Sequence, residues 1–322
     1  MTETSKKPLI DVENLSVHFG SVTDPVRAVD GVNFQIFSGE IVALVGESGS
    51  GKSISALALA KLVPEPAGRI VGGKILFQCL DLRYSESAFR IPEKRQPEEE
   101  RQQSSQPSCN DFQGLEKQKG AGTACFQGLE VLKLKSSELR KLRGARIAYI
   151  FQEPATSLNP VFTIGWQIGE AIRLHRKGVN VTAEVEKLLT AVGLSDPKRA
   201  AKAYPHELSG GMQQRAMIAM ALACDPDLLV ADEPTTALDV TVQKQILDLL
   251  VDLREKRGLS ILLITHNLGI VANVADRVYV MNNGKIVESG ETKTVLRTPQ
   301  HNYTKKLLAA VPRLRNGGDQ NN

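Results

Sequence analysis

One motif limits the possible folds of this chain more than any other feature. It is the run Gly46-Glu47-Ser48-Gly49-Ser50-Gly51-Lys52-Ser53. The motif matches G-x-x-x-x-G-K-[S/T], and it lies between an apolar run at 41–45, read as a buried strand, and an apolar helix expected over 52–62. In such a loop the backbone N–H groups and the helix start face phosphates. Lys52 would reach the β- and γ-phosphates and Ser53 would ligate Mg²⁺. The sequence therefore predicts an α/β protein that binds a nucleoside triphosphate.

A second strand ends in two acids. The apolar run 228–231 is followed by Asp232 and Glu233. A lone acidic pair at a strand end is more often a solvated turn, but beside a phosphate loop it suits the second half of the same site. Asp232 would hold the Mg²⁺ shell, and Glu233 would act as general base or orient the attacking water. The pair predicts phosphoryl transfer to water.

The segment 208–215, Leu-Ser-Gly-Gly-Met-Gln-Gln-Arg, narrows the class of enzyme. It is similar to the signature motif of ABC-type ATPases. Ser209, Gly210 and Gly211 open a helix expected over 211–223, so bare N–H groups at a positive dipole end can meet a γ-phosphate. The resemblance implies a P-loop NTPase core of the ABC ATPase type, with an antiparallel β subdomain and an inserted α-helical subdomain.

Four further positions match motifs of that family. Gln152 resembles the Q-loop glutamine, which the family uses to sense Mg²⁺ and to face the transmembrane partner. Asp239 closes a D-loop-like run at 237–239, and His266 resembles the switch histidine that contacts the γ-phosphate. Phe19 matches the aromatic residue that stacks on adenine, although an inward-facing strand phenylalanine is the alternative.

Several longer segments resemble the oligopeptide/dipeptide importer subfamily. They are 151–160, 204–207, 231–241 and 301–312. The chain departs from that subfamily in three ways. Asn302 stands where proline is usual, no cysteine follows Cys224, and a segment at 83–125 lengthens the usual connection. Many relatives hold an iron–sulfur centre on cysteines that follow the tail. Because this sequence has no cysteine there, we expect no iron–sulfur cluster.

The resemblance implies the following organisation. An ABC ATPase spans 8–312, with a RecA-like core at about 8–82, 126–152 and 226–290, a helical subdomain at about 155–225 and the importer tail at about 291–312. The segment 92–108 holds no aliphatic or aromatic residue, so burial cannot offset its ordering entropy. We therefore expect 83–125 to be a disordered insertion and 313–322 a flexible C-terminus.

Hydrophobic periodicity and turn residues predict the elements. Three early strands at 9–12, 15–19 and 32–36 are expected to be separated by Gly20, Gly31 and Gly39, and later strands are expected at 147–151 and 261–264. The remaining expectations are helices at 163–176, at 182–192 capped by Thr182, and at 241–257 ended by Gly258, and a hairpin over 277–288 that turns at Asn283-Gly284.

Composition excludes several other classes. The 40 basic and 36 acidic residues give a net charge of +4, and nothing indicates a nucleic-acid partner. The four cysteines form no metal or redox pattern. No apolar run approaches the ~18–20 residues that span a bilayer. We therefore expect a cytoplasmic protein, and the resemblance implies that it lies peripherally on the cytoplasmic face of the cell (inner) membrane.

The resemblance also implies partners. A single copy of each motif requires a second homologous ATP-binding subunit, most simply as a heterodimer, beneath two transmembrane permeases and with an extracytoplasmic substrate-binding protein. The predicted function is ATP hydrolysis that energises peptide import. Alternatives are another cargo such as nickel, glutathione or an oligosaccharide, a soluble ABC ATPase acting on ribosomes or DNA, and a non-hydrolysing regulatory module, which intact Lys52, Glu233 and His266 disfavour.

Overall fold

The computed structural model describes residues 7–21, 23–78, 128–236 and 238–310. The predicted insertion at 83–125, the C-terminal segment 313–322 and Ala237 of the D-loop lie outside these residues, as do 79–82 and 126–127 of the expected core and 311–312 of the expected tail. The elements, in chain order, are β1 (Ile10–Gly20), β2 (Pro25–Ile36), β3 (Ile41–Val45), α1 (Lys52–Ala58), β4 (Gly68–Phe77), β5 (Leu129–Glu130), η3 (Val131–Lys133), α2 (Ser136–Leu142), β6 (Ile147–Ile150), α3 (Pro154–Ser157), α4 (Ile164–His175), α5 (Val181–Ala191), α6 (Pro197–Lys202), η4 (Pro205–Glu207), α7 (Gly210–Ala221), β7 (Leu228–Asp232), α8 (Val240–Arg257), β8 (Ser260–Thr265), α9 (Leu268–Val274), β9 (Arg277–Asn282), β10 (Lys285–Glu291), α10 (Thr292–Arg297) and α11 (Asn302–Ala309).

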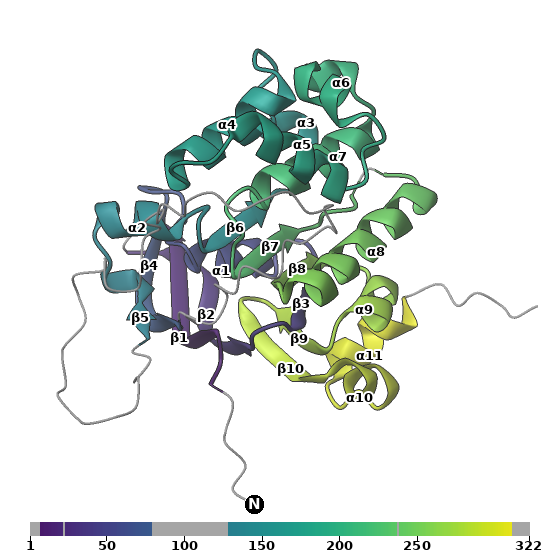
Figure 1. Cartoon of the computed structure of the whole chain (residues 1–322). Coiled ribbons are helices and arrows are strands. Elements are labelled where there is room, and N and C mark those ends of the chain that lie inside the picture. The colour runs from purple at the N-terminus through teal and green to yellow at the C-terminus, as the bar shows by residue number, and fades with distance from the viewer. Residues whose placement is uncertain (1–6, 22, 79–127, 237, 311–322) are drawn as a thin grey trace, which may run out of the picture.

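A six-stranded sheet forms the centre of the molecule, in the order β10-β9-β3-β8-β7-β6 (Figure 1). Neighbouring strands from β9 to β6 pair in parallel, and β10 closes the edge as an antiparallel hairpin with β9. Strands β3 and β8 are buried along their whole length, as expected for parallel strands covered on both faces. The sheet therefore brings the carboxyl ends of β3, β6, β7 and β8 to one edge.

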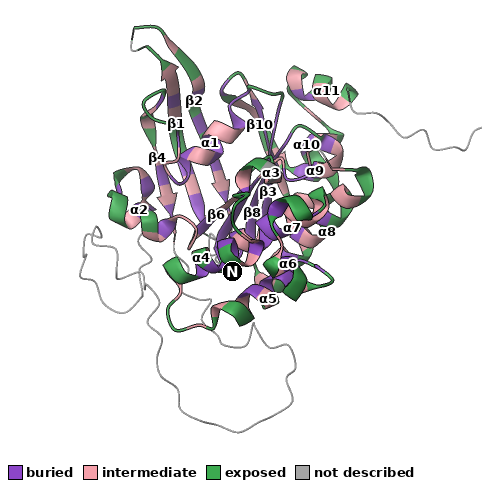
Figure 2. Ribbon diagram, turned by 90° about the horizontal axis from the view of Figure 1, so that it is seen from above, coloured by how far each residue is buried: buried purple, intermediate pink, exposed green. Residues whose placement is uncertain are grey.

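A smaller sheet, in the order β2-β1-β4-β5, is antiparallel throughout. Its apolar face joins α1 and β3 in one core, which includes Val17, Phe34, Leu59 and Leu44. Figure 2 shows the burial of these strands near the large sheet, while the far ends of β1 and β2 are exposed. The antiparallel β subdomain expected from the resemblance is confirmed.

Helices cover the rest of the large sheet. Helices α3 to α7 lie together beyond the β6 edge in Figure 1, and Ile168, Leu189 and Met217 from three of them pack in one core with Ile150 of β6. On the opposite side α9, α10 and α11 cover β3 and β9. Among the described residues, no helix is both long and apolar enough to cross a membrane.

Three expectations about the elements are wrong in detail. The strands predicted at 9–12 and 15–19 are one strand, β1, because pairing with β2 continues on both sides of a register shift between Val12 and Leu15. Gly31 lies inside β2. Asn180, whose side chain accepts from the Ala183 amide, caps α5 in place of Thr182. Helix α1 ends at Ala58 because the chain turns there, with Lys61 at a φ of 53°. The caps and turns predicted at Gly258 and Asn283-Gly284 are confirmed.

Candidate active site

The phosphate loop connects β3 to α1 along a path that only glycine can follow at two points. Gly46 has a φ of 156° and Gly51 a φ of 101°. A Cβ on Gly46 would overlap the Met281 carbonyl oxygen, and one on Gly51 would overlap the carbonyl oxygen of Ala28. The loop is therefore packed closely against β2 and β9, with no room for a side chain at Gly46 or Gly51.

Lys52 begins α1 and is buried, with 5% of its surface exposed. Its ammonium group donates to the carbonyl oxygens of Gly46 at 2.9 Å and Glu47 at 2.7 Å, and to Ser50 Oγ at 3.4 Å. Burial lowers the pKa of Lys52, against the attraction of the carboxylates of Glu233, Asp232 and Glu47. Ser50 is buried with it, while Glu47, Ser48 and Gly49 are exposed.

Ser53 and Asp232 meet at the base of the loop. Asp232 is the last residue of β7, and its carboxyl group lies close enough to the Ser53 hydroxyl for that hydroxyl to influence its pKa. Burial raises the pKa of Asp232, and the Ser53 hydroxyl opposes that change. Two of the three predicted metal ligands, Ser53 and Asp232, therefore lie near each other, with oxygen donors of the kind that Mg²⁺ prefers.

Glu233 follows β7, and its carboxylate accepts three side-chain hydrogen bonds. Gln152 Nε2 lies 3.0 Å and Thr236 Oγ1 2.9 Å from Oε2, while His266 Nδ1 lies 3.0 Å from Oε1. Glu233 has a φ of 46°, a strained value for a residue that is not glycine. The three predicted catalytic residues are thus brought together around one carboxylate.

These contacts determine the charge of Glu233. Burial alone would raise the pKa of its carboxyl group, but the hydrogen bonds from His266 and Thr236 and the nearby charge of Lys52 outweigh burial and lower it. The group is therefore ionised near neutral pH. Sequence reasoning missed Thr236, although its place three residues after Glu233 was a usable signal.

The signature and D-loop residues form a second cluster. Ser209 caps α7 by accepting from the Met212 amide at 3.4 Å, and Asp239 caps α8 by accepting from the Val242 amide at 2.9 Å. A Cβ on Gly211 would lie 2.8 Å from the Val242 side chain, so the two helix starts pack closely. Ser209, Gly210 and Asp239 are exposed.

The two clusters do not complete each other within one chain. Over the part of the chain that the structure describes, no hydrogen bond or ion pair joins residues 209–211 or Asp239 to the phosphate loop. Phe19 stands apart on β1, half-buried, with its ring lying over Gly68. Its remaining exposed surface is compatible with either the stacking role or the core role.

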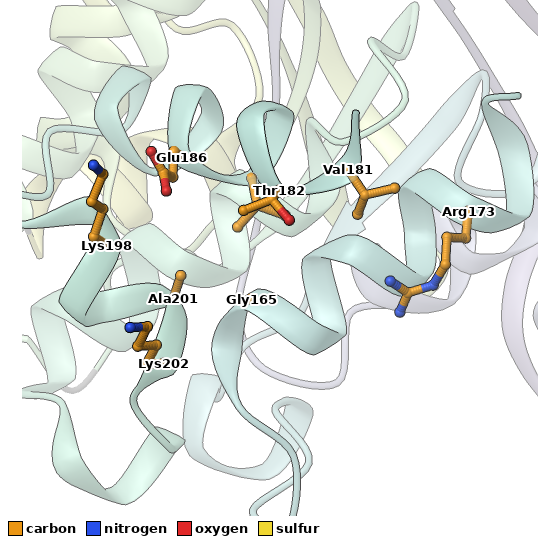
Figure 3. A pocket seen from close by; sticks show the side chains of 9 residues that line it. Gly165, Arg173, Val181, Thr182, Glu186, Lys198, Ala201 and Lys202 are labelled. Atoms are coloured by element: carbon orange, nitrogen blue, oxygen red, sulfur yellow. The ribbon is translucent and has the colours of Figure 1, made fainter. Parts of the chain in front are cut away.

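A separate hollow of about 340 Å³ lies among α4, α5 and α6 (Figure 3). Arg173, Lys198 and Lys202 bring positive charge to its lining, and Glu186 brings one negative charge. None of the predicted site residues lines it. The hollow is therefore a feature of the helical layer rather than part of the candidate active site.

Comparisons with known families agree with this arrangement. The family described as ABC transporter matches residues 29–107 and 109–236. A second family, described as the C-terminal region of oligopeptide/dipeptide transporters, matches residues 287–322. Together they cover the phosphate loop, the signature segment and the tail.

Curated relatives match nearly the whole chain. The dipeptide transport ATP-binding proteins DppD of Escherichia coli and Haemophilus influenzae are 43% and 42% identical, over 94% and 96% of this chain and 78% and 79% of their own lengths. The peptidoglycan transport ATP-binding protein YejF of Agrobacterium fabrum is 47% identical over 97% of this chain. The chain spans 49% of the length of that relative.

Solved structures match the fold. The dimeric ABC transporter cassette MJ0796 aligns with a TM-score of 0.65 at 24% identity, covering 88% of this chain and 98% of that one. The same cassette in a post-hydrolysis state bound to ADP and Pi aligns with a TM-score of 0.64 at 23% identity, with the same coverage. The chain therefore belongs to the ABC transporter family, as an ATP-binding ATPase of its oligopeptide/dipeptide group.

Proposed function

We propose that this ATPase drives the import of peptides through a membrane transporter. The observation that carries the cargo class is the match of residues 287–322 to the C-terminal region of oligopeptide/dipeptide transporters. The DppD relatives, which are named for dipeptide transport, support the same class.

ATP would bind with its phosphates in the loop 46–53, where Lys52 reaches the β- and γ-phosphates and Phe19 stacks on the adenine. Ser53, Asp232 and Gln152 would hold Mg²⁺, which supplies positive charge at the phosphate oxygens. The nearness of the Ser53 hydroxyl to the Asp232 carboxyl group, which is evident in its effect on the pKa of Asp232, supports this assignment. Among the described residues there is no group of three or more His, Cys, Asp or Glu side chains that could hold a metal ion.

Glu233 would accept the proton of the attacking water. As the water oxygen bonds to the γ-phosphorus, the bond to ADP breaks and the proton moves to the carboxylate. The lowered pKa of Glu233 keeps the carboxylate ready to accept it. His266 and Gln152, which touch its two oxygens, would contact the γ-phosphate and its metal once nucleotide is bound.

Two subunits would complete the sites. Ser209, Gly210 and Asp239 are exposed and Gly211 is half-buried, and among the described residues no hydrogen bond or ion pair joins them to the phosphate loop of their own chain. We therefore assign them to the ATP of a partner, in a head-to-tail dimer with a second, homologous ATP-binding subunit. The dimeric MJ0796 cassette has the same fold.

A permease would dock beside Gln152. Phe151, Phe162 and Trp166 are exposed by 45%, 36% and 41%, and the last two rings stack 4.0 Å apart. Exposed aromatic groups of this kind are typical of interaction sites. The subunit would thus lie at the cytoplasmic face of the inner membrane, under two permeases served by an extracytoplasmic binding protein, with no nucleic-acid partner.

A second candidate cargo is peptidoglycan. The observation that favours it is the 47% identity to a relative named for peptidoglycan transport. Uptake of a labelled dipeptide, with and without excess unlabelled peptidoglycan fragments, separates the two. If excess unlabelled dipeptide reduces the uptake and the fragments do not, the cargo is peptides. If the fragments also reduce the uptake, the cargo class includes peptidoglycan fragments.

The direct test is Glu233→Gln in the assembled transporter. We expect ATP to bind, the dimer to persist and hydrolysis to be nearly abolished, because the amide cannot accept the proton. Gel filtration with ATP measures the dimer, and phosphate release measures turnover. Cells that carry the variant should lose dipeptide uptake. Wild-type turnover in Glu233→Gln would remove this residue from the catalytic role.

A further inference from the structure

The C-terminal tail is docked against the catalytic core. Helices α10 and α11 lie beside α9 at the yellow end of the chain in Figure 1. Leu307 and Leu308 of α11 pack against a core that includes Val271 and Val280. Apolar contact of this kind holds the described part of the tail, 291–310, in one place.

Glu288 of β10 anchors the turn that leads into α11. Its carboxylate accepts from the amides of Gln300 at 2.7 Å and His301 at 3.1 Å. His301 Nδ1 in turn caps α11 by accepting from the Tyr303 amide at 3.1 Å. These bonds fix the first turn of α11, and therefore the direction of the Tyr303 side chain.

Tyr303 reaches the phosphate loop. The backbone N–H of Glu47 donates to Tyr303 Oη at 3.0 Å, across 256 positions of sequence. Tyr303 is half-buried, while Glu47 and the two residues after it are exposed. The bond thus ties the tail to the most exposed part of the loop.

Glu47 also accepts a hydrogen bond from Lys52. The Glu47 carbonyl oxygen accepts from Lys52 Nζ at 2.7 Å and from the Ser50 amide at 3.2 Å. Tyr303 therefore holds the N–H of Glu47 and Lys52 holds its carbonyl oxygen. A displacement of Glu47 would move the acceptor that places the ammonium group.

We propose that Tyr303 is a positioning residue for the phosphate loop, through which docking of the tail strengthens ATP binding. This inference rests on the proposed binding of ATP by that loop. Because coupling between two sites is reciprocal, ATP should also strengthen docking of the tail.

Tyr303→Phe tests the inference in the full chain. The ring keeps its packing and the acceptor is lost, so we expect the Kd values of ATP and ADP to rise about two- to tenfold, the range for one net hydrogen bond. The kcat at saturating ATP should be unchanged, because the loop is held alike before and during the reaction. Tyr279→Phe is the matched control, since its hydroxyl accepts from the Gln35 amide at 3.0 Å instead, and its Kd values should equal those of wild type.

Hydrogen exchange supplies the reciprocal measurement. ATP should slow exchange of the α11 amides in wild type and much less in Tyr303→Phe, a difference that a merely structural role would not produce. The inference would be overturned if the Kd values of Tyr303→Phe equal those of wild type. It would also be overturned if ATP does not change the exchange rate of the α11 amides in wild type. Failure of wild type to bind ATP would instead refute the proposed function of the loop.

Discussion

Replacing Gly49 or Gly51 by alanine tests how closely the phosphate loop is packed, because the same methyl group is added at two positions with different surroundings. Both have positive φ, 78° and 101°. A Cβ on Gly49 would meet nothing within 4 Å. A Cβ on Gly51 would overlap the Ala28 carbonyl oxygen and lie 2.7 Å from Met281 Cε, about 1 Å inside normal contact.

The magnitudes follow from these surroundings. Gly49→Ala should cost only the left-handed conformation of an L-residue, about 1–2 kcal/mol. Gly51→Ala should add the cost of forcing the loop away from β2, about 1–3 kcal/mol more. At about 2.1 cal/mol/K of unfolding entropy per residue, 1 kcal/mol lowers the Tm of a chain of this size by roughly 1.5–2 °C.

Thermal unfolding of the two variants without nucleotide measures the difference. Gly51→Ala should melt several degrees below Gly49→Ala, and its ATP affinity should fall further because the loop is displaced. Equal melting temperatures would show that β2 does not press on the loop at Gly51, and would refute the reasoning from close contact.

Two further predictions concern a cap and the tail. Asn180→Ala should lower the free energy of unfolding by about 0.5–2 kcal/mol through loss of the α5 cap, while Thr182→Ala changes it little; denaturant unfolding of both measures the contrast, and equal effects would contradict the assignment. Burial would raise the pKa of Glu288, but hydrogen bonds to its carboxylate, including that from His301, outweigh burial and lower it. Because its folded pKa lies below 4.5, the stability it contributes is present above pH 4.5 and is lost as the pH falls through the folded pKa. Exchange of α11 amides should then accelerate relative to α8, and no selective acceleration would contradict the anchor.

Local signals predicted the parts of the fold that depend on neighbours in sequence. The buried strands β3, β7 and β8 were evident from apolar runs, and the left-handed Gly258 that ends α8 from its position. The continuity of β1 was not evident from the sequence, because the register shifts within it depend on pairing with β2 and β4.

The same distinction applies to the site. Each predicted catalytic residue came from a motif, but no pattern within a motif could place Tyr303 beside Glu47, since 256 positions separate them. The tail residues attracted attention as a family resemblance only. Their contact with the loop depends on how α11 packs, which is a property of the whole core.

The order of the large sheet explains why three distant segments meet at Glu233. Strand β7 lies between β6 and β8. Gln152 follows β6, Glu233 follows β7 and His266 follows β8, so neighbouring parallel strands deliver all three to one edge. The Glu233 side chain is 16% exposed and held by three donors, whereas that of His266 is 63% exposed. The Glu233 carboxylate is therefore the fixed member of the group. Gln152 and His266 are the members that can leave this carboxylate and contact a phosphate instead.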